Sequence, residues 1–194
     1  MSNELSPGLI VSAYAQGIFP MADEDGTVYW FSPDPRAIIE LEGFHASRSL
    51  QRVYRQGRFK LTIDEDFSSV IDGCADRAEG TWISADIRRT FIELNRLGFA
   101  HSVEVWRDGR LAGGIYGIAL GGAFFAESMF HRVSNASKVA LYYLIQRLRK
   151  RGFILFDVQF TTPHLHRHGC TEIPRAEYFE RLDAALHLQC RLTD

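Results

Sequence analysis

The sequence has no long hydrophobic run and few cysteines. Its longest apolar stretches, such as residues 153–156, are far shorter than the roughly 20 residues of a membrane-spanning helix. No charged, apolar and small-residue series typical of a signal peptide opens the chain. Cys74, Cys170 and Cys190 are an odd number of cysteines without CxxC spacing, which argues against a disulfide framework or a zinc ribbon. We therefore expect a cytoplasmic protein with free thiols.

An excess of charge of one sign is also lacking. The formal net charge is -2 and the sequence pI is about 6.4, so only a local basic patch could attract nucleic acid. One candidate is Arg48, Arg52 and Arg55, whose spacing places them along one helical face. Residues 147–151 form a second basic cluster at the end of a predicted helix. Cations there also stabilise the helix dipole, so this second cluster is the weaker candidate.

What is present is enough for one substantial hydrophobic core. The chain has 194 residues, of which 46% are hydrophobic. An acidic, turn-rich stretch at residues 23–35 predicts a boundary between a small N-terminal lobe, residues 1–34, and a main domain, residues 35–194. Within the lobe, Ser6 and Gly17 mark the start and the end of a helix.

The main domain alternates between predicted strands and helices. Tight turns at residues 108–109 and 121–122 join three successive strands into an antiparallel meander. The expected strands are residues 37–41, 59–63, 101–106, 111–119, 123–130 and 153–160, and the expected helices begin at Ser47, Asp66, Ser84, Asn135 and Pro174. The strand that follows the Asn135 helix should lie parallel to the meander. This predicts an α+β fold with a mixed, largely antiparallel sheet covered by helices, compatible with a GNAT-like acyltransferase.

Three polar side chains interrupt two of these predicted strands. Alternation along residues 153–160 places Asp157 and Gln159 together on one face, and Glu127 interrupts residues 124–130 in the same way. Burying an amide without a partner costs on the order of 2–7 kcal/mol. Each group could satisfy loop amides instead, but three of them on two neighbouring strands favour a substrate site.

Eight segments in order carry a family resemblance: YAQGIFPM, WFSPDPR, EGTWIS, GFAHSVEVW, GGIYGIALGGAFFAESMF, NASKVAL, DVQF and GCTEIPRAEY. Together they resemble the leucyl/phenylalanyl-tRNA–protein transferase family over the span from Tyr14 to Tyr178. Short motifs recur by chance, whereas eight ordered segments do not. The resemblance is therefore specific.

This resemblance implies transfer of leucine or phenylalanine, with methionine as a further donor, from aminoacyl-tRNA to proteins that begin with Arg or Lys. The product carries an N-terminal degradation signal. The reaction is aminolysis of an ester, which runs downhill, so neither ATP nor a metal or other cofactor is expected. Positioning two reactants can contribute roughly 7–11 kcal/mol. An α-amino group with a pKa of about 7.7–8.0 needs no strong base. We expect a monomer that does not bind membranes.

The resemblance also implies roles for individual residues. Asp157 and Gln159 match the family's catalytic pair, in which we expect Gln159 to accept a hydrogen bond from the amine and Asp157 to hold Gln159. Glu127 matches a pocket carboxylate that could recognise either the cationic acceptor residue or an amino group. The other pocket residues that it implies are Tyr14, Met21, Trp82, Ile115, Phe124, Met129 and Leu144, each of which could instead be an ordinary core residue.

The resemblance implies that the basic helix face contacts tRNA. At Met21 the chain also departs from the pattern of the family. Arg48, Arg52 and Arg55 fall on the family's tRNA contact surface, where phosphate contacts should weaken steeply with salt. Met21 stands where members often have tryptophan, so stacking on the terminal adenosine is weaker or comes from elsewhere. The chain is also shorter at both ends than the longer family members.

Other functions have weaker support in the sequence. His164, His166, His168 and Cys170 alternate as in a metal-binding strand, but they follow a proline in a helix or loop, where i and i+2 diverge, so no metal is expected. Residues 132–138 precede a helix where a GNAT enzyme binds pyrophosphate, yet they contain no glycine. An acyl-CoA-dependent GNAT N-acyltransferase and a tRNA-binding module without catalysis remain the alternatives.

Overall fold

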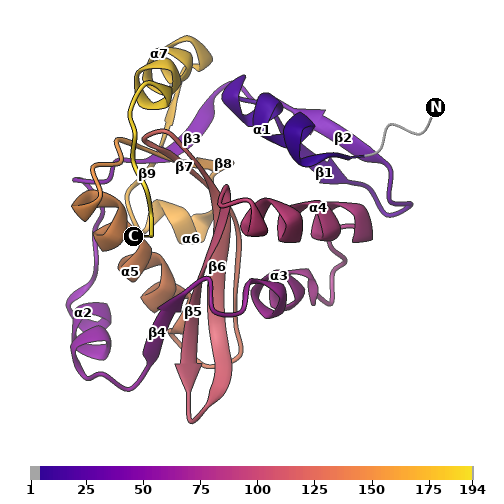
Figure 1. The fold of residues 1–194 in the computed structure, drawn as a ribbon. Coiled ribbons are helices and arrows are strands. Elements are labelled where there is room, and N and C mark those ends of the chain that lie inside the picture. The colour runs from indigo at the N-terminus through magenta and orange to yellow at the C-terminus, as the bar shows by residue number, and fades with distance from the viewer. Residues whose placement is uncertain (1–4, 194) are drawn as a thin grey trace.

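The computed structural model describes residues 5–193, which form a seven-stranded mixed sheet, a separate two-stranded sheet and helices on both faces of the larger sheet (Figure 1). The strands are β1 (Phe19–Ala22), β2 (Val28–Phe31), β3 (Arg36–Ile39), β4 (Lys60–Ile63), β5 (Ala100–Arg107), β6 (Arg110–Leu120), β7 (Ala123–His131), β8 (Leu155–Gln159) and β9 (Cys170–Ile173). The helices are α1 (Pro7–Ala15), α2 (Arg48–Arg55), α3 (Phe67–Ala75), α4 (Ala85–Arg96), α5 (Ala136–Lys150), α6 (Pro163–His166) and α7 (Arg175–Leu186). None of the helices within residues 5–193 is long and apolar enough to span a membrane.

The order of the strands confirms the predicted α+β layout. The large sheet runs β4-β5-β6-β7-β8-β3-β9, and its pairs are antiparallel except for β7 with β8, which is parallel as expected for the strand after α5. In Figure 1, α3 and α4 lie on one side of this sheet and α2 and α5 on the other. The sheet therefore has a hydrophobic core on each face.

Side-chain caps explain where several helices begin. Ser47, Asp66 and Ser84 each accept a hydrogen bond from a backbone N–H in the first turn of α2, α3 and α4, which confirms the predicted starts. Asn135 also precedes its predicted helix, but it has a left-handed backbone (φ 71°) and its side chain forms no capping hydrogen bond. The start of α5 is therefore fixed by the left-handed backbone of Asn135 and by packing of the apolar face of the helix, and not by a side-chain cap.

Three short strands were not predicted. Strand β2 lies within the stretch that was expected to be a loop, and it pairs with β1, while β9 pairs with β3. Each of the three has four residues, and β2 places consecutive aromatic side chains at exposed positions, so no alternation marks it in the sequence. These strands are defined by pairing with their neighbouring strands, and not by a hydrophobic pattern in their own sequences.

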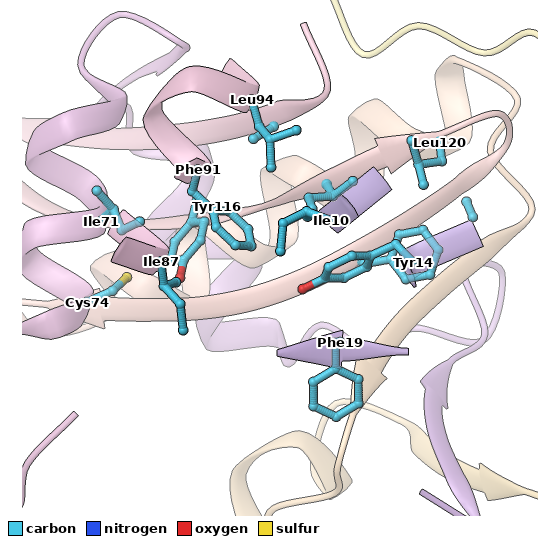
Figure 2. Packing of buried hydrophobic residues seen from close by; sticks show 14 of the residues in the cluster. Ile10, Tyr14, Phe19, Ile71, Cys74, Ile87, Phe91, Leu94, Tyr116 and Leu120 are labelled. Atoms are coloured by element: carbon cyan, nitrogen blue, oxygen red, sulfur yellow. The ribbon is translucent and has the colours of Figure 1, made fainter. Parts of the chain in front are cut away.

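The N-terminal segment packs into the core of the main body. Ile10 and Tyr14 of α1 are fully buried in the same cluster as Phe91 and Tyr116, and Figure 2 shows these side chains together. The β1–β2 sheet is separate from the large sheet. Division of the chain into a lobe of residues 1–34 and a main domain stays a prediction.

Within residues 5–193 the large sheet has three register shifts, and two of them are bulges on the neighbouring strands β7 and β8. On β7, Ser128 pairs with Tyr116 and Ala126 pairs with Gly117, so Glu127 is an additional residue without a partner across the ladder. Such a bulge reverses the alternation of side chains beyond it. On β8 the partners of β3 skip one position in the same way, and the additional residue there is Val158.

Candidate active site

The site lies where the parallel pairing of β7 and β8 stops. The last paired residues are Phe125 and Asp157. Two positions further along each strand, the side chains of Glu127 and Gln159 meet instead, with Gln159 Nε2 donating to Glu127 Oε1 at 2.8 Å. A side-chain contact thus replaces the backbone ladder, and a pocket opens beside it.

This pocket has an outer and an inner part. The outer cavity has a volume of about 320 Å³ and the inner one about 80 Å³. Both are lined by Glu127, Ser128, Met129, Val158, Gln159 and Leu165. The inner part adds the apolar side chains of Ile115, Ala126, Leu141 and Phe156. A mainly apolar recess with few polar groups at its mouth is typical of a small-molecule or side-chain binding pocket.

The carboxylate of Asp157 lies behind this pocket and is fully buried. Its oxygens accept hydrogen bonds from Arg36 Nη2 at 2.7 Å, from the Tyr178 hydroxyl at 2.6 Å and from the backbone N–H of Gln159 at 2.8 Å. Asp157 lines neither part of the pocket. The expectation that Asp157 and Gln159 project together is therefore wrong, because only Gln159 reaches the cavity.

Arg36 is the buried partner of Asp157, and sequence reasoning missed it. Its Nη1 donates to the carbonyl of Gly17 at 3.0 Å, and its guanidinium lies over the rings of Phe19 and Tyr178 at 4.8 and 4.6 Å. Burial lowers the pKa of the guanidinium, but the charge and hydrogen bonds of Asp157 raise it overall. The signal for this role was an arginine at the first position of the otherwise apolar strand β3, at the end of the WFSPDPR segment.

Gln159 has an unusual backbone conformation. Its φ is +60°, in the left-handed region, which costs an ordinary residue roughly 1–2 kcal/mol. Asp157 holds the Gln159 N–H in this conformation, and the preceding bulge at Val158 breaks the alternation of the strand. Together these two features explain why the Gln159 amide points into the pocket, whereas the Asp157 carboxylate lies behind it.

Glu127 is the carboxylate that does line the pocket. Burial raises its pKa to about 8, and the nearby charge of Asp157 adds to this rise. Tyr14, Arg36 and Gln159 act in the opposite direction and lower the pKa. Within residues 5–193 the buried Tyr14 hydroxyl has no hydrogen-bond partner of normal geometry, so it acts on Glu127 as a nearby dipole. Glu127 is therefore able to change its protonation near neutral pH.

The pocket contains some of the predicted binding residues but not all. Ile115 and Met129 line the inner part, and Met21 and Trp82 line the outer part. Phe124 and Leu144 lie in the core behind it and line neither part. Sequence reasoning missed Arg77, Ser128, Leu141, Phe156, Val158 and Leu165 as lining residues. Ser128 and Val158 adjoin the polar residues that were singled out, so adjacency was the signal for them.

The basic face that was expected to contact tRNA lies on α2. Arg48, Arg52 and Arg55 are exposed, and α2 is anchored by the buried side chain of Leu50. The ring of Tyr54 packs edge-on against Tyr142 of α5, with their centroids 4.9 Å apart. Because Leu141 of the same helix lines the inner cavity, α5 connects this basic face with the pocket.

The histidine run does not form a metal cluster within the described part of the chain. His168 is buried, and its ring stacks on Phe44 with centroids 5.5 Å apart. His166 ends α6, and the side chain of His164 lies outside the described residues. His168 therefore has a packing role.

The fold and the site define the class of protein. An apolar recess that ends beside an amide and a carboxylate can hold a hydrophobic side chain while its polar mouth orients a reacting amine. This arrangement is that of a group-transferring enzyme.

Comparison with known proteins gives the family. Residues 3–34 match the model for the leucyl/phenylalanyl-tRNA protein transferase N-terminal domain, and residues 38–183 match the model for leucyl/phenylalanyl-tRNA protein transferase. A leucyl/phenylalanyl-tRNA–protein transferase from Gloeobacter violaceus is 54% identical over 96% of this chain and 97% of its own length. One from Rubrobacter xylanophilus is 55% identical over 95% and 96%. The chain belongs to the leucyl/phenylalanyl-tRNA–protein transferase family.

The solved structures that match are more distant. A GCN5-related N-acetyltransferase from Kribbella flavida is 12% identical, with a TM-score of 0.46, over 86% of this chain and 60% of its own. L-PGS from Bacillus licheniformis is 13% identical, with a TM-score of 0.45, over 81% and 54%. At these TM-scores neither structure bears on the activity of the chain.

Proposed function

We propose that this protein transfers leucine or phenylalanine, and methionine as a further donor, from aminoacyl-tRNA to the α-amino group of proteins that begin with Arg or Lys. The product would carry an N-terminal degradation signal. The observation that carries the proposal is the hydrogen bond between Gln159 and Glu127 at the mouth of an apolar recess. The NH₂ of Gln159 donates to Glu127, so the carbonyl oxygen of the same amide is left to accept from an amine.

The apolar recess supports a donor with a hydrophobic side chain. The inner cavity, lined by side chains such as Ile115, Leu141 and Phe156, would hold the leucyl or benzyl group. The ester carbonyl would then lie near Gln159, and the acceptor amine would approach from the outer cavity. Holding both reactants in this geometry can lower the activation free energy by roughly 7–11 kcal/mol.

Asp157 and Arg36 have positioning roles in this proposal. Asp157 fixes the backbone of Gln159, and Arg36 fixes Asp157. Neither side chain lines the pocket, so neither touches the substrate. Glu127 does line it, and its position beside Gln159 favours contact with an amino group over contact with the side chain of the acceptor residue.

The exposed arginines of α2 would bind the tRNA backbone. Arg48, Arg52 and Arg55 lie on one face, and cations of this kind neutralise phosphates without reading sequence. We further propose a monomeric, cytoplasmic enzyme. The free thiols of Cys74, Cys170 and Cys190 suit a reducing compartment.

The test is a transfer assay with labelled Leu-tRNA, Phe-tRNA and Met-tRNA. Each is offered with three peptides that differ only in an N-terminal Arg, Lys or Ala. We expect label to appear on the Arg and Lys peptides and not on the Ala peptide. Transfer to all three peptides would contradict the acceptor specificity. Absence of transfer to any peptide, with acylation from acetyl-CoA instead, would overturn the proposed function.

A further inference from the structure

Two carboxylates lie close to Gln159, and they differ in what they can reach. The oxygens of Asp157 are occupied by Arg36, Tyr178 and the Gln159 backbone, and no part of Asp157 lines the pocket. Glu127 lines both the outer and the inner cavity. It is therefore the carboxylate that a reacting group in the pocket would meet.

The bulge on β7 brings Glu127 to this position. As the additional residue between Ala126 and Ser128, Glu127 has no partner across the ladder on β6. Its Oε1 accepts from the side chain of Gln159, which fixes the carboxyl group beside the amide. The two functional groups thus border the same space. One can accept a hydrogen bond from an amine, and the other can accept its proton.

We propose that Glu127 is the catalytic base that takes a proton from the attacking α-amino group and returns it to the departing ribose oxygen. This inference rests on the proposed aminoacyl transfer. In the forward direction the amine nitrogen bonds to the ester carbonyl carbon and loses one proton to the Glu127 carboxylate. The bond from that carbon to the ribose oxygen then breaks, and Glu127 protonates the oxygen. Glu127 ends the cycle ionised, and no other reactant is consumed.

The surroundings of Glu127 give it a suitable proton affinity. The charged and titratable groups that face it are Tyr14 of α1, Arg36 of β3, Arg77 after α3, Tyr116 of β6 and Asp157 of β8. Burial, with Asp157 behind it, sets its pKa at about 8. A general base works best when its pKa lies near the operating pH, because it is then both available and able to give the proton back.

The experiment compares wild type with Glu127→Gln and Glu127→Asp under saturating Phe-tRNA and Arg-peptide from pH 6 to 9. We expect Glu127→Gln to lose about 10²–10⁴-fold in kcat, the range typical of general acid–base catalysis, while the Kd for Phe-tRNA changes less than threefold. Glu127→Asp, which keeps a carboxylate, should recover part of the loss. Formate added to Glu127→Ala should also recover part of it.

The pH profile separates catalysis from binding. Measured with the Arg-peptide below its KM, the rate gives kcat/KM. Both the amine and Glu127 must be deprotonated in wild type, so log kcat/KM should rise with a slope near two below pH 7. In Glu127→Gln only the amine titrates, and the slope should fall to one. An unchanged slope, or a loss confined to KM, would overturn the role as base. Wild-type transfer in the same assay keeps this outcome distinct from failure of the proposed function.

Discussion

The guanidinium of Arg36 and the carboxylate of Asp157 form a two-point ion pair inside the protein, with side-chain exposures of 1% and 0%. They belong to β3 and β8, which are neighbours in the sheet, and Asp157 in turn holds the backbone of Gln159. A buried pair of this kind adds little net stability over apolar residues, but removing one partner is costly. Its contribution is therefore to fix the geometry of the pocket.

Arg36→Met should destabilise the protein by roughly 3–5 kcal/mol, because it leaves the Asp157 carboxylate buried and unpaired. Arg181→Met is the matched control, since Arg181 pairs with Glu177 and Glu40 at the partly exposed surface and should cost about 1 kcal/mol or less. Urea denaturation of both variants measures the difference. A loss for Arg36→Met no larger than that of the control would contradict the role of the pair.

Gln159→Ala should lower turnover far more than it lowers the affinity for aminoacyl-tRNA, because in the proposed reaction the amide contacts the attacking amine and not the tRNA. Gln159→Gly separates activity from folding. Glycine adopts the left-handed φ without strain, so this variant should be as stable as wild type or about 1 kcal/mol more stable, yet equally impaired in turnover. Single-turnover kinetics, filter binding and thermal melting give the three quantities. Comparable losses in turnover and affinity would argue against the assignment.

The stability of the protein should depend on pH through Glu127. Its pKa is near 4.3 in the unfolded chain and about 8 in the fold, so between these values the folded state binds more protons. The contribution of this group to the free energy of unfolding is therefore fully present below about pH 4.3. It is lost progressively as the pH rises from there through about 8. Glu127→Gln lacks this titration. Its stability relative to wild type should increase by about 1 kcal/mol per pH unit between pH 5 and 8. A difference that does not vary with pH would contradict the raised pKa.

Val158→Leu should change the choice of donor. Val158 lines both cavities, so an added methylene narrows the recess that is proposed to hold the donor side chain. One methylene in such a pocket is worth about 1–3 kcal/mol, or roughly 10–200-fold. We expect transfer of phenylalanine to fall relative to leucine by at least tenfold, measured as the ratio of kcat/KM values. An unchanged ratio, with the melting temperature retained, would show that the side chain binds elsewhere.

Replacing Arg48, Arg52 and Arg55 together by glutamine should weaken aminoacyl-tRNA binding and reduce its salt dependence. Removing three phosphate contacts should lower the slope of log K against log salt by about two to three. Arg96→Gln on α4, on the opposite face of the sheet, is the matched control and should leave the slope unchanged. A salt slope equal to wild type in the triple variant would remove α2 from the tRNA surface.

Elements with strong local signals could be predicted from the sequence. The caps at Ser47, Asp66 and Ser84 and the glycine turns of the meander depend on neighbouring residues, so the sequence shows them directly. Strands β1, β2 and β9 could not be predicted, because four-residue strands depend on distant partners. The site was also predictable only in part. Glu127 and Gln159 could be recognised as polar residues in apolar strands, and Met129 as a pocket position.

The orientation of the side chains at the site could not be predicted from the sequence. Strict alternation placed Asp157 and Gln159 on one face, and nothing in the sequence marks the bulge at Val158 or the left-handed φ of Gln159. Nor could Arg36 be recognised as the partner of Asp157, since 121 positions separate them in the chain. These contacts arise only when the sheet is assembled.

The two surplus residues in β7 and β8 also determine how this enzyme can change over generations. Deleting Glu127 or Val158 would remove the bulge but leave the later residues of that strand with the partners, and hence the faces, that they have now. Loss of a single codon at either position would thus take away one residue of the pocket and the local distortion around it, while sparing the scaffold. The lining positions, by contrast, can vary one at a time, so donor preference can drift gradually while the chemistry itself is kept or lost in one step.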